Sequence, residues 1–335
     1  MANSDTNTAP LNVQPTAASG SIFKRFIKMR EANLIVIILA LFIVMSFASP
    51  YFLTWANMKA MMLSFSTEGI VVVGMTVLII VGGIDLSVGA VMCLAMVIAG
   101  KLFLMGMNPW LASLISIGCS GLLGLAMGLC VTKIRLHTFI VSLAMMGIAR
   151  GLAMTITQGT PLSLFTLPPE FKFIGQGTVM GVPFVIVIFF IIVIISDYLL
   201  RHHAALRKVY YTGSNEAAAQ YSGINIDKIK VGAIILCTTF AGLAGIIYMS
   251  KFGAATPNFG VGLELNIIAA AVIGGASLKG GEGSVLGAIL GIALLSVVSS
   301  SLILLDVSPY WQDLIKGLIL LVAVSIDQIL HDKQK

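Results

Sequence analysis

Long apolar runs separated by short polar segments dominate the pattern along this 335-residue chain. The runs lack the alternation of a half-buried strand, and many approach the roughly 20 residues that a helix needs to cross a bilayer. We therefore expect an all-α polytopic membrane protein with about ten transmembrane helices. The predicted spans are 33–48, 69–81, 88–105, 109–131, 138–156, 184–199, 231–249, 263–276, 284–303 and 311–326. Spans two and eight are short, so eight full crossings with broken or re-entrant segments are an open alternative.

The positions of the Lys and Arg residues predict the orientation. If the amino terminus is cytoplasmic, 14 of the 20 basic residues fall in cytoplasmic segments and only Lys59, Lys172 and Lys251 fall outside. Because cytoplasmic loops carry an excess of Lys and Arg, both termini are expected in the cytoplasm.

The same pattern divides the chain into one membrane domain and two tails. Residues 1–22 are rich in Ser, Thr, Asn, Ala and Pro and predict a disordered cytoplasmic tail. Residues 23–330 form a single predicted transmembrane domain, with a long polar cytoplasmic segment at 200–230, and 331–335 form a second cytoplasmic tail. Two outer loops, 157–183 and 250–262, are the predicted surfaces for an extracytoplasmic partner.

Composition narrows the function classes. Hydrophobic residues make up 58% of the chain, charged residues 10%, and the mean hydropathy is +1.02, so lipid is the main solvent. The net charge of +6 fits cytoplasmic loops better than nucleic-acid binding. The sequence contains no GxxxxGK[ST], HExxH or GxSxG motif, and its four cysteines lie in apolar runs without CxxC spacing. We therefore expect no catalytic residue, metal site or cofactor in this chain.

Glycine spacing predicts close helix packing. Gly283, Gly287 and Gly291 form a GxxxGxxxG pattern, and Gly124 and Gly128 form GxxxG. Such patterns let helices approach closely in lipid, and packing within one chain is favoured over a seam between two copies.

A faint internal similarity links two glycine-rich segments. VGGIDLSVG at 81–89 resembles IGGASLKGG at 273–281. Spans two to five and seven to ten start in opposite directions, which permits an inverted repeat.

The cytoplasmic segment 213–223 predicts a short helix. Ser214 or Asn215 can cap its start, Glu216 suits the positive first turn, and Gly223 can end it. Three alanines give this helix a smooth face that would fit a cleft in a moving partner. An ordinary connector between spans is the alternative.

Several segments carry a resemblance to a known family. Glu216, Ala217 and Ala218, followed by Gly223, resemble the EAA-type coupling motif of ABC importer permeases. Four blocks in chain order resemble the signatures of ribose/xylose/galactose-type permeases, within the superfamily that also takes branched-chain amino acids: GGIDLSVG (82–89), FIVSLAMMGIARGLAM (139–154), SNEAAAQYSGI (214–224) and ELNIIAAAVIGGASLKGGEGSVLGAILG (264–291). The resemblance runs from Phe47 to Asp327. His137 and Thr138 depart from it, because the family commonly has proline there.

The resemblance implies the transmembrane permease subunit of an ATP-binding cassette importer for a monosaccharide or related small polar solute, in the bacterial inner membrane. It implies three partners: a cytoplasmic ABC ATPase that holds ATP and Mg, a periplasmic sugar-binding protein, and a second permease copy or homologue. By the same resemblance, the residues that carry ATPase coupling are Glu216, Ala217, Ala218 and Gly223. Those in blocks that shape the translocation path are Asp85, Ser87, Arg150, Glu264 and Asn266.

The charges inside the spans leave other interpretations open. A charge at the centre of a helix costs about 2.5–3.5 kcal/mol on insertion scales, so Arg150 is not expected to face lipid. Arg150 can pair with a carbonyl or an acid instead of contacting solute, and Asp85 can cap a helix end at the glycine-rich break. An ion-coupled secondary transporter would use Asp85, Glu264 or Arg150 as coupling groups, and it stands as the alternative function.

Overall fold

A computed structural model describes residues 30–332 of the chain. The predicted tail 1–22 and residues 333–335 of the other tail lie outside this range. Within it, the apolar helices are α2 (Arg30–Ala48), α3 (Trp55–Ile80), α4 (Val88–Leu104), α5 (Pro109–Lys133), α6 (Thr138–Thr157), α8 (Phe184–His202), α11 (Ile226–Phe252), α12 (Leu263–Ile273), α13 (Val285–Leu304) and α14 (Pro309–Asp332). They correspond in order to the ten predicted spans, which confirms an all-α polytopic membrane protein.

The remaining elements are short and lie between the long helices. The helices among them are α7 (Pro169–Gln176), α9 (Ala204–Ser214) and α10 (Glu216–Tyr221), and the strands are β1 (Leu162–Ser163), β2 (Thr178–Val179), β3 (Val182–Pro183) and β4 (Ala254–Ala255).

Span lengths confirm one expectation and correct another. Among the described residues, seven helices are long and apolar enough to cross a membrane, and α4 and α12 are shorter apolar helices. The 11-residue α12 confirms that span eight is short. Span two is not short, because α3 has 26 residues and begins 14 residues before the predicted start. Polar residues such as Ser64 and Glu68 dilute the hydropathy of its first half, but the side chain of Thr54 caps the helix by accepting from the amide of Asn57.

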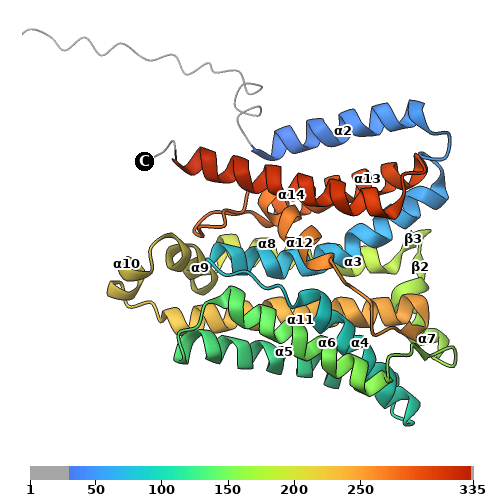
Figure 1. The fold of residues 1–335 in the computed structure, drawn as a ribbon, viewed down its shortest axis with the longest axis horizontal. Coiled ribbons are helices and arrows are strands. Elements are labelled where there is room, and N and C mark those ends of the chain that lie inside the picture. Colours follow the sequence, from blue (N-terminus) through green and yellow to red (C-terminus); the bar gives the residue numbers. More distant parts are fainter. Residues whose placement is uncertain (1–29, 333–335) are drawn as a thin grey trace, which may run out of the picture.

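The two ends of the molecule differ in content. Figure 1 shows α9, α10 and the end of α14 at one end, and α7, β2 and β3 at the opposite end. The end of α14 therefore lies on the same side as the 200–230 segment, as the charge distribution predicts.

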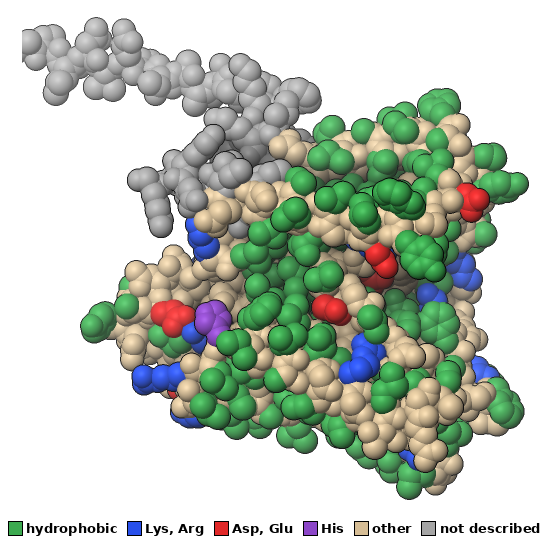
Figure 2. Space-filling model, in the orientation of Figure 1, with side chains coloured by type: hydrophobic (Ala, Val, Ile, Leu, Met, Phe, Trp, Pro, Cys, Tyr) green, Lys and Arg blue, Asp and Glu red, His purple; other side chains and the backbone are tan. Residues whose placement is uncertain are grey.

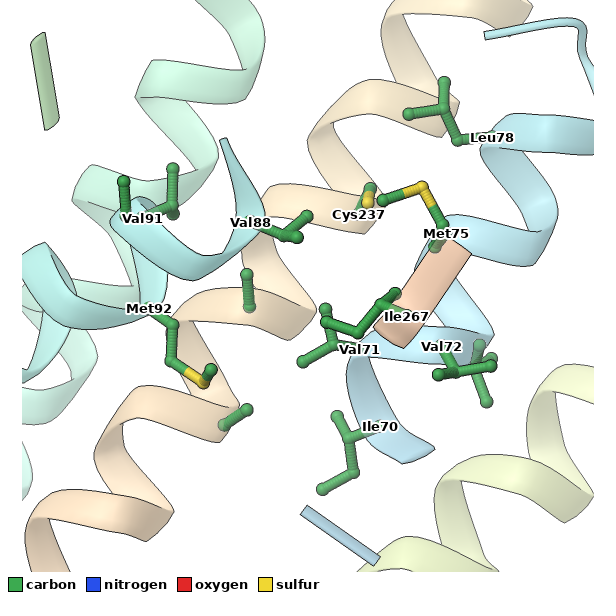
Figure 3. Close-up of a cluster of buried hydrophobic side chains, with 14 of the residues drawn as sticks. Ile70, Val71, Val72, Met75, Leu78, Val88, Val91, Met92, Cys237 and Ile267 are labelled. Atoms are coloured by element: carbon green, nitrogen blue, oxygen red, sulfur yellow. The ribbon is translucent and has the colours of Figure 1, made fainter. Parts of the chain in front are cut away.

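The core forms around α3, α4 and α11. In the apolar 18-residue stretch of α3, 78% of the residues are buried, whereas in that of α2 only 17% are buried. Figure 3 shows Val71 and Met75 of α3 directed toward Val88 of α4 and Cys237 of α11. Outer helices present apolar side chains such as Leu114 instead, and Figure 2 shows hydrophobic side chains over much of the visible face. This distribution fits a protein whose surroundings are lipid.

Helix packing within the chain accounts for the glycine patterns. A Cβ on Gly128 would lie 3.1 Å from Val231 of α11, and one on Gly124 would lie 2.9 Å from the Cα of Ile235. Gly291 faces the carbonyl oxygen of Ala270 on α12 in the same way. The backbones approach this closely because no side chain separates them, which confirms the prediction of intramolecular packing.

The two predicted outer loops form one layer. β1 pairs with β4 in antiparallel register, with Leu162 opposite Ala255. α7 docks on the end of α11, where Ser250 Oγ accepts from the amide of Gly175 at 2.9 Å and donates to the carbonyl of Phe171 at 2.8 Å.

Candidate functional site

Local hydrogen bonds define both ends of the short cytoplasmic helix α10. The side chain of Asn215 accepts from the amide of Ala218 at 3.0 Å, so Asn215 is the cap and Ser214 belongs to α9. At the other end Gly223 has φ +79°, and the amide of Ile224 donates to the carbonyl of Ala219 at 3.0 Å. This is a Schellman ending, which needs a left-handed residue and therefore favours glycine. The predicted helix and both of its ends are confirmed.

The outer surface of α10 is free for a partner. Glu216, Ala217 and Ala218 are exposed, and Tyr221 has an exposed fraction of 93%. Only Ala219 of this helix is buried. Figure 1 places α10 at one extreme end of the molecule, beyond the ends of the long helices.

An ion pair and a cavity lie on the inner side of α10. Glu216 forms a salt bridge with Lys230 near the start of α11. A cavity of about 810 Å³ separates α10 from the α5–α6 connection, and its lining includes Gln220, Arg135 and His137. α10 is therefore joined to α11 by an ion pair, whereas the cavity separates it from the α5–α6 connection.

The end of α9 meets two glycine-rich breaks, backbone to backbone. The amide of Gly281 donates to the carbonyl of Ile80 at 2.8 Å. A Cβ on Gly213 would lie 2.6 Å from that Gly281 nitrogen and closer still to the Ile80 oxygen, while one on Gly280 would lie 3.1 Å from the amide nitrogen of Gly82. We call this contact the glycine junction. It joins the segment before α10 to the α3–α4 break and the α12–α13 break, where the two similar sequences 81–89 and 273–281 lie.

A tyrosine adds a second connection from α9. The hydroxyl of Tyr210 donates to the carbonyl of Gly283 at 3.1 Å. Burial raises the pKa of this hydroxyl, and the nearby Asp197 carboxylate raises the pKa further. Tyr210 therefore stays neutral and keeps its donor at neutral pH.

Asp85 and Ser87 shape the start of α4. Asp85 is fully buried, and its Oδ1 accepts from the amide of Ser87 at 2.7 Å and from the Ser87 hydroxyl at 2.6 Å. The cap position of α4 is Ser87, which makes no side-chain cap hydrogen bond, so Asp85 does not cap the helix itself and instead holds the residue that precedes it. Its other oxygen, Oδ2, has no hydrogen-bond partner among the described residues.

Arg150 is a structural anchor in this geometry. Its Nη1 donates to the carbonyls of Pro257 at 2.9 Å and Phe259 at 2.7 Å, which ties α6 to the segment before α12. This is the carbonyl pairing left open by the sequence. An arginine engaged in this way is not free to serve as an ion-coupling group.

The structure separates the two predicted residues on α12. Glu264 lies over the first turn of α4, where a Cβ on Gly89 would come within 2.9 Å of its Oε2. Asn266 instead lines a cavity with Glu68 of α3. The predicted path residues therefore form two groups: Asp85, Ser87 and Glu264 lie around the start of α4, and Asn266 lies elsewhere.

Three residues of these sites were missed by the sequence analysis. Glu68 lies one residue before the predicted start of span two, and continuing the helix backwards would have revealed it. Lys230 and Gly213 carry no such signal, because their partners lie far away along the chain. No group of three His, Cys, Asp or Glu side chains suited to a metal occurs in the part of the chain that the structure describes.

Comparison with known proteins gives a consistent result. Residues 57–324 match the family described as branched-chain amino acid transport system / permease component. The chain is 36% identical over 301 residues to the ribose import permease protein RbsC of Escherichia coli K12, covering 89% of this chain and 94% of that protein. It is 34% identical to RbsC of Bacillus subtilis over 86% of this chain and 89% of that protein. It is 32% identical to the D-allose transport system permease protein AlsC of E. coli K12, over 85% and 87% of the two chains. No solved structure matches this chain.

Proposed function

This chain belongs to the branched-chain amino acid transport system permease family, and from that membership we propose that it forms the translocation path of an ABC importer for a monosaccharide. It is a multi-pass transporter subunit rather than an enzyme. The observation that carries the sugar assignment is the likeness to ribose and allose permeases along most of both chains. The family match runs from residue 57 in α3 to residue 324 in α14 and includes the segment 200–230, so it is not limited to one motif.

The proposed assembly has three partners and lies in the bacterial inner membrane. A cytoplasmic ATPase, which binds ATP and Mg, docks on the exposed face of α10 through Glu216, Ala217 and Ala218. A periplasmic sugar-binding protein docks on the layer formed by the 157–183 and 250–262 loops. A second permease copy or homologue completes the path. The exposure of α10 and the joining of the two loops support these positions.

The glycine junction supplies the route by which motion of the ATPase reaches the helices. α10 follows α9 directly, and Gly213 at the end of α9 contacts the breaks on either side. A shift of α10 therefore acts on α3–α4 and α12–α13 through backbone contacts, which transmit displacement because no flexible side chain lies between them. Gly223 keeps α10 a short rigid unit during this shift.

Reconstitution tests the proposed function. The chain is placed in lipid vesicles with an ABC ATPase and a binding protein of the same importer, and uptake of labelled ribose, allose and arabinose is measured. We expect uptake of at least one sugar that requires all components and ATP. Uptake by the chain alone, driven by a proton or sodium gradient, would assign it to the secondary transporters instead.

A further inference from the structure

A cavity of about 350 Å³, lined by both polar and apolar side chains, lies between α3, α12, α13 and α14, apart from the contacts described above. Its volume is at the small end of the range of about 300–1,000 Å³ that is typical of small-molecule sites. The polar residues of its lining are Asn57, Ser64, Glu68, Asn266, Ser296, Ser299, Ser300, Gln312 and Lys316.

The cavity occupies the outer half of the membrane domain. Asn57 and Gln312 lie in the first turns of α3 and α14, at the ends opposite to α10. Glu68 lies 13 residues into α3, which is about 20 Å along the helix at 1.5 Å per residue. The cavity therefore extends from the outer face toward the middle of the bilayer, the direction in which an imported solute first travels.

Some polar groups of the lining are held in place by the protein. The hydroxyl of Ser64 donates to Glu68 Oε1 at 3.0 Å, which orients the carboxylate. The hydroxyl of Ser300 donates to Asn57 Oδ1 at 2.9 Å. Two helices, α3 and α13, thus contribute fixed polar groups to one space.

Other polar groups are left for an occupant. The amide of Asn266 and the hydroxyls of Ser296 and Ser299 make no hydrogen bond to other described groups of the protein. At membrane depth such groups cost free energy unless water or a solute pairs with them. An ionisable residue at this depth, such as Glu68, is itself a sign of function.

The charges of the lining indicate a neutral occupant. Glu68 and Lys316 have opposite charges and lie on different helices of the lining, and Lys316 also lies 3.8 Å from Asp313. A lining that carries both a positive and a negative charge favours neither an anion nor a cation. Carboxylate, amide, ammonium and hydroxyl groups can together pair with the several hydroxyls of a neutral polyol.

We propose that this cavity is a monosaccharide site within a single permease subunit, in which Glu68 and Asn266 contact the sugar hydroxyls on the outer half of the path. This inference rests on the proposed function and specifies where the solute pauses. A phospholipid headgroup or water alone are the other possible occupants, and the experiment distinguishes them.

Two variants and one label test the site in the complete transporter. In the first arm, Glu68→Gln removes the charge but keeps the shape, and Glu31→Gln on the peripheral helix α2 is the matched control. We expect the KM for uptake to rise at least tenfold, or about 1.4 kcal/mol, in Glu68→Gln, because a hydrogen bond to a charged group is stronger than one to a neutral group. Co-purification with the ATPase should match that of the control, which shows that the complex assembles.

In the second arm, Ser299→Cys is placed in a background without the native cysteines and treated with a membrane-impermeant thiol reagent from the outer side. A saturating monosaccharide that the transporter takes up should slow labelling of this thiol, and Glu68→Gln should weaken the protection. Asn266→Leu should weaken it as well and so provides a second variant.

The outcomes separate the two proposals. Sugar uptake by the wild-type complex decides the proposed function, whereas protection of the Ser299→Cys thiol decides the cavity. Uptake with an unchanged KM in Glu68→Gln and labelling that no sugar slows would show a water-filled space and overturn the site. Labelling that depends on phospholipid composition but not on sugar would assign the cavity to a lipid headgroup and also overturn it.

Discussion

Gly213→Ala tests whether the glycine junction carries force from the ATPase to the pore. The new Cβ would lie 2.6 Å from the amide nitrogen of Gly281 and closer to the Ile80 oxygen, whereas ordinary contact begins at 3.4 Å. The backbones must therefore separate by about 0.8 Å or more, and overpacking of this kind costs about 1–3 kcal/mol. If this cost applies only to the conformation in which α9 contacts both breaks, the equilibrium between that conformation and the others shifts by about 5- to 150-fold.

The assay compares three quantities in reconstituted complexes: co-purification of the ATPase, stimulation of its activity by sugar-loaded binding protein, and sugar uptake. Gly213→Ala should retain the ATPase, because the exposed face of α10 is unchanged, but lose most of the stimulation and uptake. Gly232→Ala is the matched control, since a Cβ there meets nothing within 4 Å. Normal stimulation and uptake in Gly213→Ala would refute transmission through the junction. Loss of the ATPase would place the defect in docking instead.

Three further predictions concern the cytoplasmic helix and the orientation. Gly223→Val should abolish uptake while the protein still inserts normally, because a residue with a side chain at φ +79° costs about 1–2 kcal/mol. Glu216→Lys should also abolish uptake. Full uptake in both variants would show that α10 is only a connector. Asn215→Ala should destabilise the start of α10 by about 0.5–2 kcal/mol, seen as faster amide exchange in 216–221, and unchanged exchange would argue against the cap. In intact cells, Ser214→Cys should resist an impermeant thiol reagent and Lys172→Cys should react; labelling at position 214 would contradict the ten-span orientation.

Local patterns of the sequence were enough for the elements and for the coupling helix. Span positions follow from apolar runs, because every backbone group of a lipid-exposed segment must be satisfied within the helix. The ends of α10 follow from Asn215 and Gly223, because a cap and a left-handed ending depend only on neighbouring residues. Orientation follows from the loop charges for the same reason, since each loop meets the membrane surface separately.

Only the tertiary structure decided where polar residues inside the membrane belong. The first half of α3 is too polar to be recognised as a span, but the fold places it against other helices: Asn57 accepts from Ser300 of α13, and Phe65 packs on Phe189 of α8. The fold brings Gly213 against Gly281, 68 positions away along the chain, and places Glu68 and Asn266, 198 positions apart, around one cavity. Hydropathy measures how readily each residue enters lipid, whereas these residues lie against other parts of the protein. The free energy of a buried polar group is therefore set by the neighbours that the fold provides.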